Sequence, residues 1–292
     1  MNVLKSRSLS WLVAAGALVG LTAFVVLPQL FEDDASGIPT NTTVIAAQDG
    51  GNDTVKKLEQ QVEANAADFG AHINLAYAYL QRVRETGDPS LYSAADNVLA
   101  KAAKIGTNDP ELFAAQSLLA QARHEFADAL VYAEKALAID TEHARYYGLR
   151  ADAQIELGMY PEAIDSLQNM ADRRPDFALY TRMAYARELY GDPEGALEAL
   201  QAAVEAGSSV PENMAWAYVQ LGDRSFELGD FSGAGAQYAR ALSRVPDYPG
   251  ALAGQARLAA MLEDYEAAAT LLQKAFERAP LAEYAIALGD LY

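Results

Sequence analysis

Cysteine is absent from the 292 residues, so the chain has no disulfide, no thiolate nucleophile and no cysteine ligand for a metal. Histidine occurs only as His72, His124 and His143. His124-Glu125 matches the start of the zincin motif, but Asp128 occupies the place of its second histidine. The sequence also lacks a Walker-type phosphate loop and a Gly-x-Ser-x-Gly nucleophile elbow. We therefore expect no enzyme activity, no metal site and no cofactor.

Basic residues are also few. The chain has 22 Lys and Arg against 40 Asp and Glu, which gives a formal net charge of −18. Such a surface repels nucleic acids and anionic lipid headgroups, so we expect no nucleic-acid partner. The simplest role of the excess acid is to keep the protein soluble.

Charged residues are missing altogether between Ser8 and Phe31. Residues 9–27, LSWLVAAGALVGLTAFVVL, are long and apolar enough to cross a bilayer as one helix. A cleaved signal peptide is the alternative, but its apolar region is usually shorter and a small-x-small cleavage site should follow. The run ends instead in Leu-Pro-Gln-Leu-Phe. We predict an uncleaved signal-anchor, a transmembrane helix over 9–27, although the sequence leaves cleavage open.

The charges beside this run predict its orientation. Lys5 and Arg7 precede it, and Glu32, Asp33 and Asp34 follow it. The positive side stays in the cytoplasm, so we expect residues 1–8 there and the rest of the chain outside, in an extracytoplasmic or periplasmic space. Residues 28–54 are rich in Gly, Asp, Thr and Asn without periodicity, which predicts a flexible tether. The expected localisation is a single-pass membrane protein, most simply of a bacterial cell membrane.

The remaining sequence, residues 55–292, repeats one pattern. Helix-like phrases opening with a turn and an aromatic residue recur, such as GMYPEAIDSLQNMADRRP (158–175) and GDFSGAGAQYARALSRVP (229–246). Small residues mark equivalent points, spaced 34, 33, 38 and 34 apart, at Ala129, Ala163, Ala196, Ala234 and Ala268. A period of about 34 residues made of helix pairs indicates an all-α solenoid.

The pattern predicts about six helix pairs plus the first helix of a seventh. Val55–Ala66 is expected to form a short leading helix, and Gln81–Thr86 to lengthen the first helix of the first pair or to form a loop. Glu283–Tyr292 resembles the start of a further unit, which favours a sequence that is a piece of a longer protein. Packing as a lone closing helix is the alternative.

Residues 55–292 resemble the tetratricopeptide repeat family. Trp216–Pro246, WAYVQLGDRSFELGDFSGAGAQYARALSRVP, carries the leading aromatic, the Leu-Gly pair, the turn Gly-Asp-aromatic, the small Ala234 and the closing Pro. The resemblance implies a right-handed superhelical solenoid whose concave face, lined by the first helices, binds peptides or proteins without catalysis. Carried onto this sequence, it implies a partner-binding groove that includes Tyr77, Arg145, Asp152, Tyr185, Glu188, Trp216, Asp223, Phe226 and Arg257.

These features predict a membrane-tethered scaffold that holds a protein or peptide in its groove. Trp216, Tyr185 and Arg145 are the expected anchors, because exposed aromatic residues and Arg dominate binding energy. The alternative is the substrate-recruiting part of a longer chain whose catalytic or transport domain lies beyond residue 292. Self-association through the C-terminal helix, residues 281–292, is a further expectation.

Overall fold

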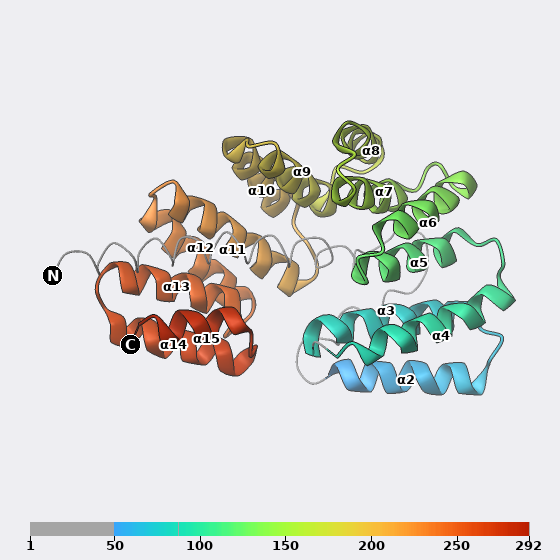
Figure 1. The fold of residues 1–292 in the computed structure, drawn as a ribbon, viewed down its shortest axis with the longest axis horizontal. Coiled ribbons are helices and arrows are strands. Elements are labelled where there is room, and N and C mark those ends of the chain that lie inside the picture. Colours follow the sequence, from blue (N-terminus) through green and yellow to red (C-terminus); the bar gives the residue numbers. More distant parts are fainter. Residues whose placement is uncertain (1–49, 87, 292) are drawn as a thin grey trace. The chain divides into compact units, whose positions relative to one another are not determined.

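The computed structural model describes residues 50–86 and 88–291, and these form fourteen α-helices without a β-strand among them (Figure 1). The predicted all-α fold is confirmed. The predicted cytoplasmic segment 1–8, the transmembrane helix 9–27 and most of the tether 28–54 lie outside the described residues. Within the described ranges, no helix is both long and apolar enough to cross a membrane.

The chain divides into two units, whose described parts are residues 50–186 and 187–291. The first comprises eight helices, the last of which crosses the boundary: α2 (Gly50–Ala64), α3 (Phe69–Thr86), α4 (Ser90–Ile105), α5 (Pro110–Ala122), α6 (Phe126–Ile139), α7 (Ala144–Glu156), α8 (Tyr160–Arg173) and α9 (Phe177–Leu189). The second comprises α10 (Pro193–Ala206), α11 (Pro211–Glu227), α12 (Phe231–Arg244), α13 (Pro249–Met261), α14 (Tyr265–Arg278) and α15 (Ala282–Gly289).

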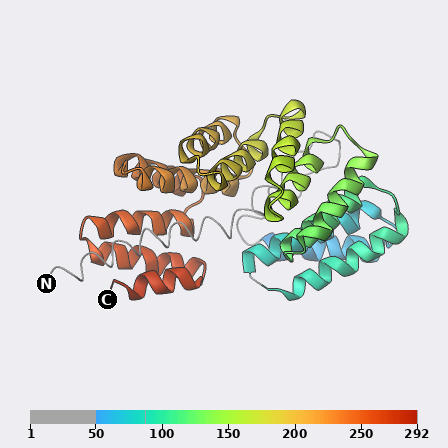
Figure 2. The ribbon, with the colours of Figure 1, turned by 45° about the horizontal axis from the view of Figure 1, so that its top comes forward.

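Helices that follow one another in sequence pack together from α2 to α8, and again from α10 to α15. Figures 1 and 2 show this stacking for α13, α14 and α15. Alanine makes the close approach possible: Ala129, Ala234 and Ala268 are fully buried, and Ala163 and Ala196 nearly so. The predicted helix-pair solenoid is therefore confirmed, with the small residues at the predicted points.

The turn between the two helices of a pair has one left-handed residue at the same place in five repeats. These residues are His124, Gly158, Gly191, Gly229 and Glu263, with φ between 60° and 82°. The residue after each one donates its backbone N–H to a carbonyl five positions back, for example Met159 to Gln154 at 2.8 Å. This is the Schellman helix ending, which glycine adopts without strain. Three repeats meet the requirement with glycine, and two with residues for which this conformation is costly.

Aspartate begins several of the helices. The side chain of Asp109 accepts a hydrogen bond from the N–H of Glu111 at 2.8 Å, ahead of Pro110 in the first turn of α5. Asp192, Asp230 and Asp264 cap α10, α12 and α14 in the same way. These caps satisfy amide groups that have no partner within the helix.

The ends of the array differ in detail from the expectations. The leading helix α2 begins at Gly50, so residues 50–54 are helical although the sequence placed them in the tether; Asp53 favours the helix from its first turn. Gln81–Thr86 extends α3 as one of the two alternatives predicted. The last helix, α15, packs against α14 and buries Tyr284 and Ala287.

Candidate partner-binding surface

The first helices of neighbouring repeats contact each other. In residues 50–186, α3 packs on α5 and α5 on α7, and in residues 187–291 α11 packs on α13. The second helices α4, α6, α8, α12 and α14 do not form corresponding contacts of similar extent. First helices therefore lie on the shorter side of each stack. We call their surface that faces away from the second helices the inner face.

The predicted groove residues fall into two groups on these helices. Tyr77, Arg145, Asp223 and Arg257 are partly accessible, and Glu188 is exposed. The other four are buried: Asp152, Tyr185, Trp216 and Phe226, each between 5% and 8% exposed.

The prediction of Trp216 and Tyr185 as exposed anchors is therefore wrong. Trp216 is 5% and Tyr185 8% exposed, and the Tyr185 hydroxyl donates a hydrogen bond to Glu156 at 3.3 Å. Phe226 packs edge-on against Phe231 of α12, with ring centroids 5.2 Å apart. Helical periodicity groups residues on one face of a helix, but it carries no information on what covers that face.

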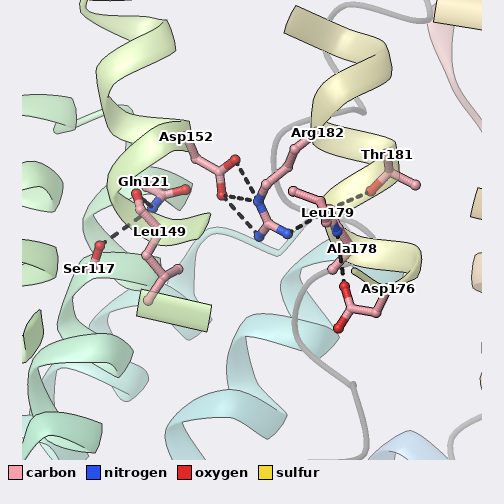
Figure 3. A network of polar contacts seen from close by, with 9 residues as sticks. All are labelled: Ser117, Gln121, Leu149, Asp152, Asp176, Ala178, Leu179, Thr181 and Arg182. Atoms are coloured by element: carbon pink, nitrogen blue, oxygen red, sulfur yellow. Dashed lines mark hydrogen bonds and ion pairs between the residues drawn. The ribbon is translucent and has the colours of Figure 1, made fainter. Parts of the chain in front are cut away.

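Asp152 is also unavailable to a partner, because it forms a buried ion pair with Arg182 (Figure 3). The Arg182 Nε and Nη2 atoms donate to the Asp152 carboxylate at 3.0–3.2 Å, and Nη1 donates to the Ala178 carbonyl at 2.9 Å. Gly148 leaves the space for the guanidinium, since a Cβ there would lie 3.0 Å from Cζ of Arg182. The pair joins α7 to α9 and is a structural element.

A polar cluster on the inner face joins α3, α5 and α7. Tyr77 donates a hydrogen bond to the Glu111 carboxylate, and Arg145 donates to Glu111 at 2.8 Å and to the Tyr77 hydroxyl at 2.6 Å. The Tyr146 hydroxyl adds a longer bond to Glu111 at 3.3 Å. Burial opposes the charge of Glu111, but Arg145 and the Tyr77 hydrogen bond outweigh it, so the pKa of Glu111 lies below its usual value.

A second cluster joins α11, α12 and α13. The Tyr238 hydroxyl donates to Asp223 at 2.7 Å and accepts from Arg257 at 2.9 Å, while Arg257 also donates to Asp223. The Tyr238 ring is fully buried against Gly222 of α11 and Gly254 of α13. Burial, reinforced by Asp223, raises the pKa of Tyr238. The hydroxyl therefore stays protonated and holds the ion pair in place.

Sequence reasoning missed Glu111 and Tyr238, although a signal was present. Tyr77, Glu111 and Arg145 lie 34 residues apart in turn, and so do Asp223 and Arg257. Opposite charges one repeat length apart on first helices meet across neighbouring repeats. This spacing distinguishes cross-repeat ion pairs from side chains that are free to bind a partner.

Glu188 belongs to an ion-pair group at the surface of residues 187–291. Arg224 of α11 donates to Glu188 of α9 and to Glu227 of its own helix. Burial raises the pKa of Glu227, and Arg224 opposes that shift. The charge of Glu188 is thus already compensated.

A pocket opens on the inner face between α11, α13 and α15. It contains about 660 Å³ of empty space, including some that is open to solvent. Small apolar side chains from α13 and α15 form much of its lining, together with Leu272 of α14. Asp223, Arg257 and Glu283 are its charged residues.

No group of three or more Asp, Glu, His or Cys in residues 50–86 and 88–291 is arranged to hold a metal ion. The polar clusters are ion pairs and tyrosine hydrogen bonds, and their groups satisfy one another.

Comparison with known proteins agrees with the repeat pattern. Residues 219–283 match the family model described as "Tetratricopeptide repeat". None of the curated protein sequences matches the chain.

Solved structures share the fold at low sequence identity. A structure of the APC/C hetero-tetramer Cut9–Hcn1 has 15% identity and a TM-score of 0.65, and covers 82% of this chain. The chain in turn spans only 46% of that protein's length. Pseudomonas aeruginosa pilF has 21% identity and a TM-score of 0.55, over 75% of this chain and 95% of its own. A tetratricopeptide repeat protein from Parabacteroides merdae has 15% identity and a TM-score of 0.58, over 82% and 90%.

Proposed function

We infer that this chain, which belongs to the tetratricopeptide repeat family, is a non-catalytic scaffold whose inner face binds a protein or peptide partner. The observation that carries the proposal is the pocket between α11, α13 and α15, a largely apolar hollow on the inner face. Side chains of a partner segment fit such a hollow, because burial of apolar surface drives association and a few polar groups set its orientation.

The ion pairs support the same role. Charged side chains on the inner face bind one another across repeats, as Arg145 does with Glu111 and Arg257 with Asp223. These contacts fix neighbouring first helices relative to one another. A surface fixed in this way binds a partner without first losing conformational freedom.

Site-specific photo-crosslinking tests whether the inner face is the binding surface. A photoreactive amino acid at Gln220 or Ala253, which line the pocket, should form adducts with a partner protein in cells. The matched positions Ala239 on α12 and Thr270 on α14 are exposed on second helices and should not. Adducts of equal yield from both sets of positions would exclude inner-face binding.

We further propose that the scaffold is tethered to a bacterial cell membrane by residues 9–27, with the repeats on the extracytoplasmic side. The support is the charge-free apolar run and its flanking charges, positive before and acidic after. Tethering would concentrate the repeats near membrane-bound partners.

A reporter enzyme that is active only outside the cytoplasm tests this topology when it is fused after Leu291. Full reporter activity is expected in the membrane fraction, and deletion of residues 9–27 should abolish it. Release of an active fusion into the soluble fraction would instead indicate a cleaved signal peptide.

A further inference from the structure

The pocket between α11, α13 and α15 contains one polar atom that the protein leaves unsatisfied. Asp223 is bound by Tyr238 and Arg257. By contrast, the Oε1 atom of Glu283 is buried and has no hydrogen-bond partner. Buried carboxylate oxygens are normally satisfied, so this atom in a pocket wall is a place where a ligand can supply the missing donor.

We propose that this pocket binds a partner segment in which a large apolar side chain stands beside a Lys or Arg, and that Glu283 receives the cation. The inference rests on the proposed scaffold function and specifies the chemistry of its partner.

The apolar part of the ligand follows from the lining. Apart from the charged residues and Gln220, the walls are mainly small or aliphatic, including Val219, Ala253, Ala256, Ala260, Leu272 and Ala287. Gly250 adds space on the α13 side because it has no side chain. A Leu, Met or Phe side chain placed here exchanges water for contacts on several sides, which is the main source of affinity at such anchors.

The basic part follows from charge. Asp223 and Arg257 neutralise each other, so the formal charge of the pocket is that of Glu283. Residues 187–292 carry 16 acidic and 7 basic residues, a net charge of −9. This field attracts basic segments and repels acidic ones before contact. At contact, Glu283 offers a Lys or Arg a charge-assisted hydrogen bond in a partly desolvated site.

The free protein gains nothing from the charge of Glu283. Burial raises the pKa of this carboxyl group, so its ionised form is disfavoured in the folded chain. Replacing it with glutamine should leave stability unchanged or raise it. If Glu283 were retained for folding, its replacement would lower the stability. Measuring both stability and peptide affinity therefore distinguishes a role in folding from a role in binding.

The test uses the full chain and an array of acetylated, amidated peptides of about twelve residues with a central Leu or Phe and random flanks. We expect bound peptides to be enriched in Lys or Arg next to the central residue. Glu283→Gln should lower their affinity about tenfold, corresponding to about 1.4 kcal/mol. For peptides in which the Lys is replaced by norleucine, the same substitution should lower the affinity less than about twofold.

Glu266→Gln is the matched control. Glu266 is in the first turn of α14, as Glu283 is in the first turn of α15. Glu266 is exposed and does not line the pocket, whereas Glu283 is partly buried and does. Its replacement should not change peptide affinity. Ala253→Trp should fill the pocket and abolish binding of all enriched peptides, and Ala253→Val replaces it if circular dichroism shows that the tryptophan variant is unfolded.

Two different failures are distinguishable. Bound peptides without basic enrichment, or equal affinities of the wild type and Glu283→Gln, would overturn the role of Glu283 and leave the scaffold function standing. If no peptide binds and the photoreactive residues at Gln220 and Ala253 form no adducts, both the role of Glu283 and the scaffold function would be overturned.

Discussion

Replacing Gly254 with alanine adds one methyl group at the point where α13 packs on the ring of Tyr238. An ideal Cβ at this position would lie 2.5 Å from Cζ and 2.7 Å from Cδ1 of the ring. Carbon atoms do not approach so closely, so the ring or the helix must shift. The ring is fully buried, and its hydroxyl is fixed between Asp223 and Arg257.

The magnitude follows from opposing contributions. Alanine favours the helix over glycine by about 1 kcal/mol. Overpacking a core costs about 1–3 kcal/mol, and loosening a hydrogen bond to a charged group costs about 1.5–3 kcal/mol. We expect Gly254→Ala to lower the free energy of unfolding by about 1.5–5 kcal/mol, which is the sum of the two costs less the gain. The same change at Gly235 should raise it by up to about 1 kcal/mol, because a Cβ there meets Leu258 at an ordinary 3.5 Å.

The assay uses tryptophan fluorescence during urea denaturation. Trp11 and Trp216 are the two tryptophans, so a Trp11→Phe background leaves Trp216 of α11 as the probe of the second unit. In a Tyr238→Ala background the clash is gone, and Gly254→Ala should become neutral or stabilising. A destabilisation that persists in that background, or a Gly254→Ala variant as stable as Gly235→Ala, would refute the packing argument.

Three further predictions follow from the buried ion pair, the turns and the inner-face cluster. Asp152→Ala should cost about 3–5 kcal/mol in urea denaturation, because it leaves Arg182 buried and unpaired, whereas the double change Asp152→Leu with Arg182→Met should cost much less. His124→Gly and Glu263→Gly should each stabilise the chain by up to about 1 kcal/mol in thermal unfolding, since both residues are left-handed; destabilisation would contradict this. The pKa of Glu111 is lowered in the folded chain, so its contribution is present above its ordinary value of 4.5 and is lost as the pH falls through the folded-state pKa. Glu111→Gln should therefore destabilise at neutral pH, and its difference from wild type should vanish in acid.

Local sequence chemistry was enough to predict the repeat frame. The left-handed turn residues His124, Gly158, Gly191, Gly229 and Glu263 have the same 34, 33, 38 and 34 spacing as the buried alanines. A change of repeat length therefore moves the turn and the core position together. This redundancy explains why helix-pair solenoids can be identified from one sequence, even where His124 and Glu263 replace the usual glycine.

The inner face was less predictable, because it depends on contacts between residues one repeat apart. Gly222 was interpretable as part of the Leu-Gly pattern, but its function is to accommodate Tyr238 jointly with Gly254. Trp216 is of a residue type that often anchors a partner, but its side chain is buried. Helical periodicity gives the direction of a side chain, whereas its burial depends on the neighbouring repeat.

The distinction between satisfied and unsatisfied charges then separates framework from binding surface. Removing one member of an ion pair leaves the other without its partner, as in Arg145–Glu111 and Arg257–Asp223. Substitutions at these four residues therefore disturb the stack of helices and report poorly on partner binding. Glu283 loses no partner on substitution, because its buried oxygen has none. A change that weakens binding at Glu283 without lowering stability therefore identifies a contact with the partner. Weaker binding after substitution of Arg257 would not identify such a contact, because that substitution also removes a support of the pocket wall.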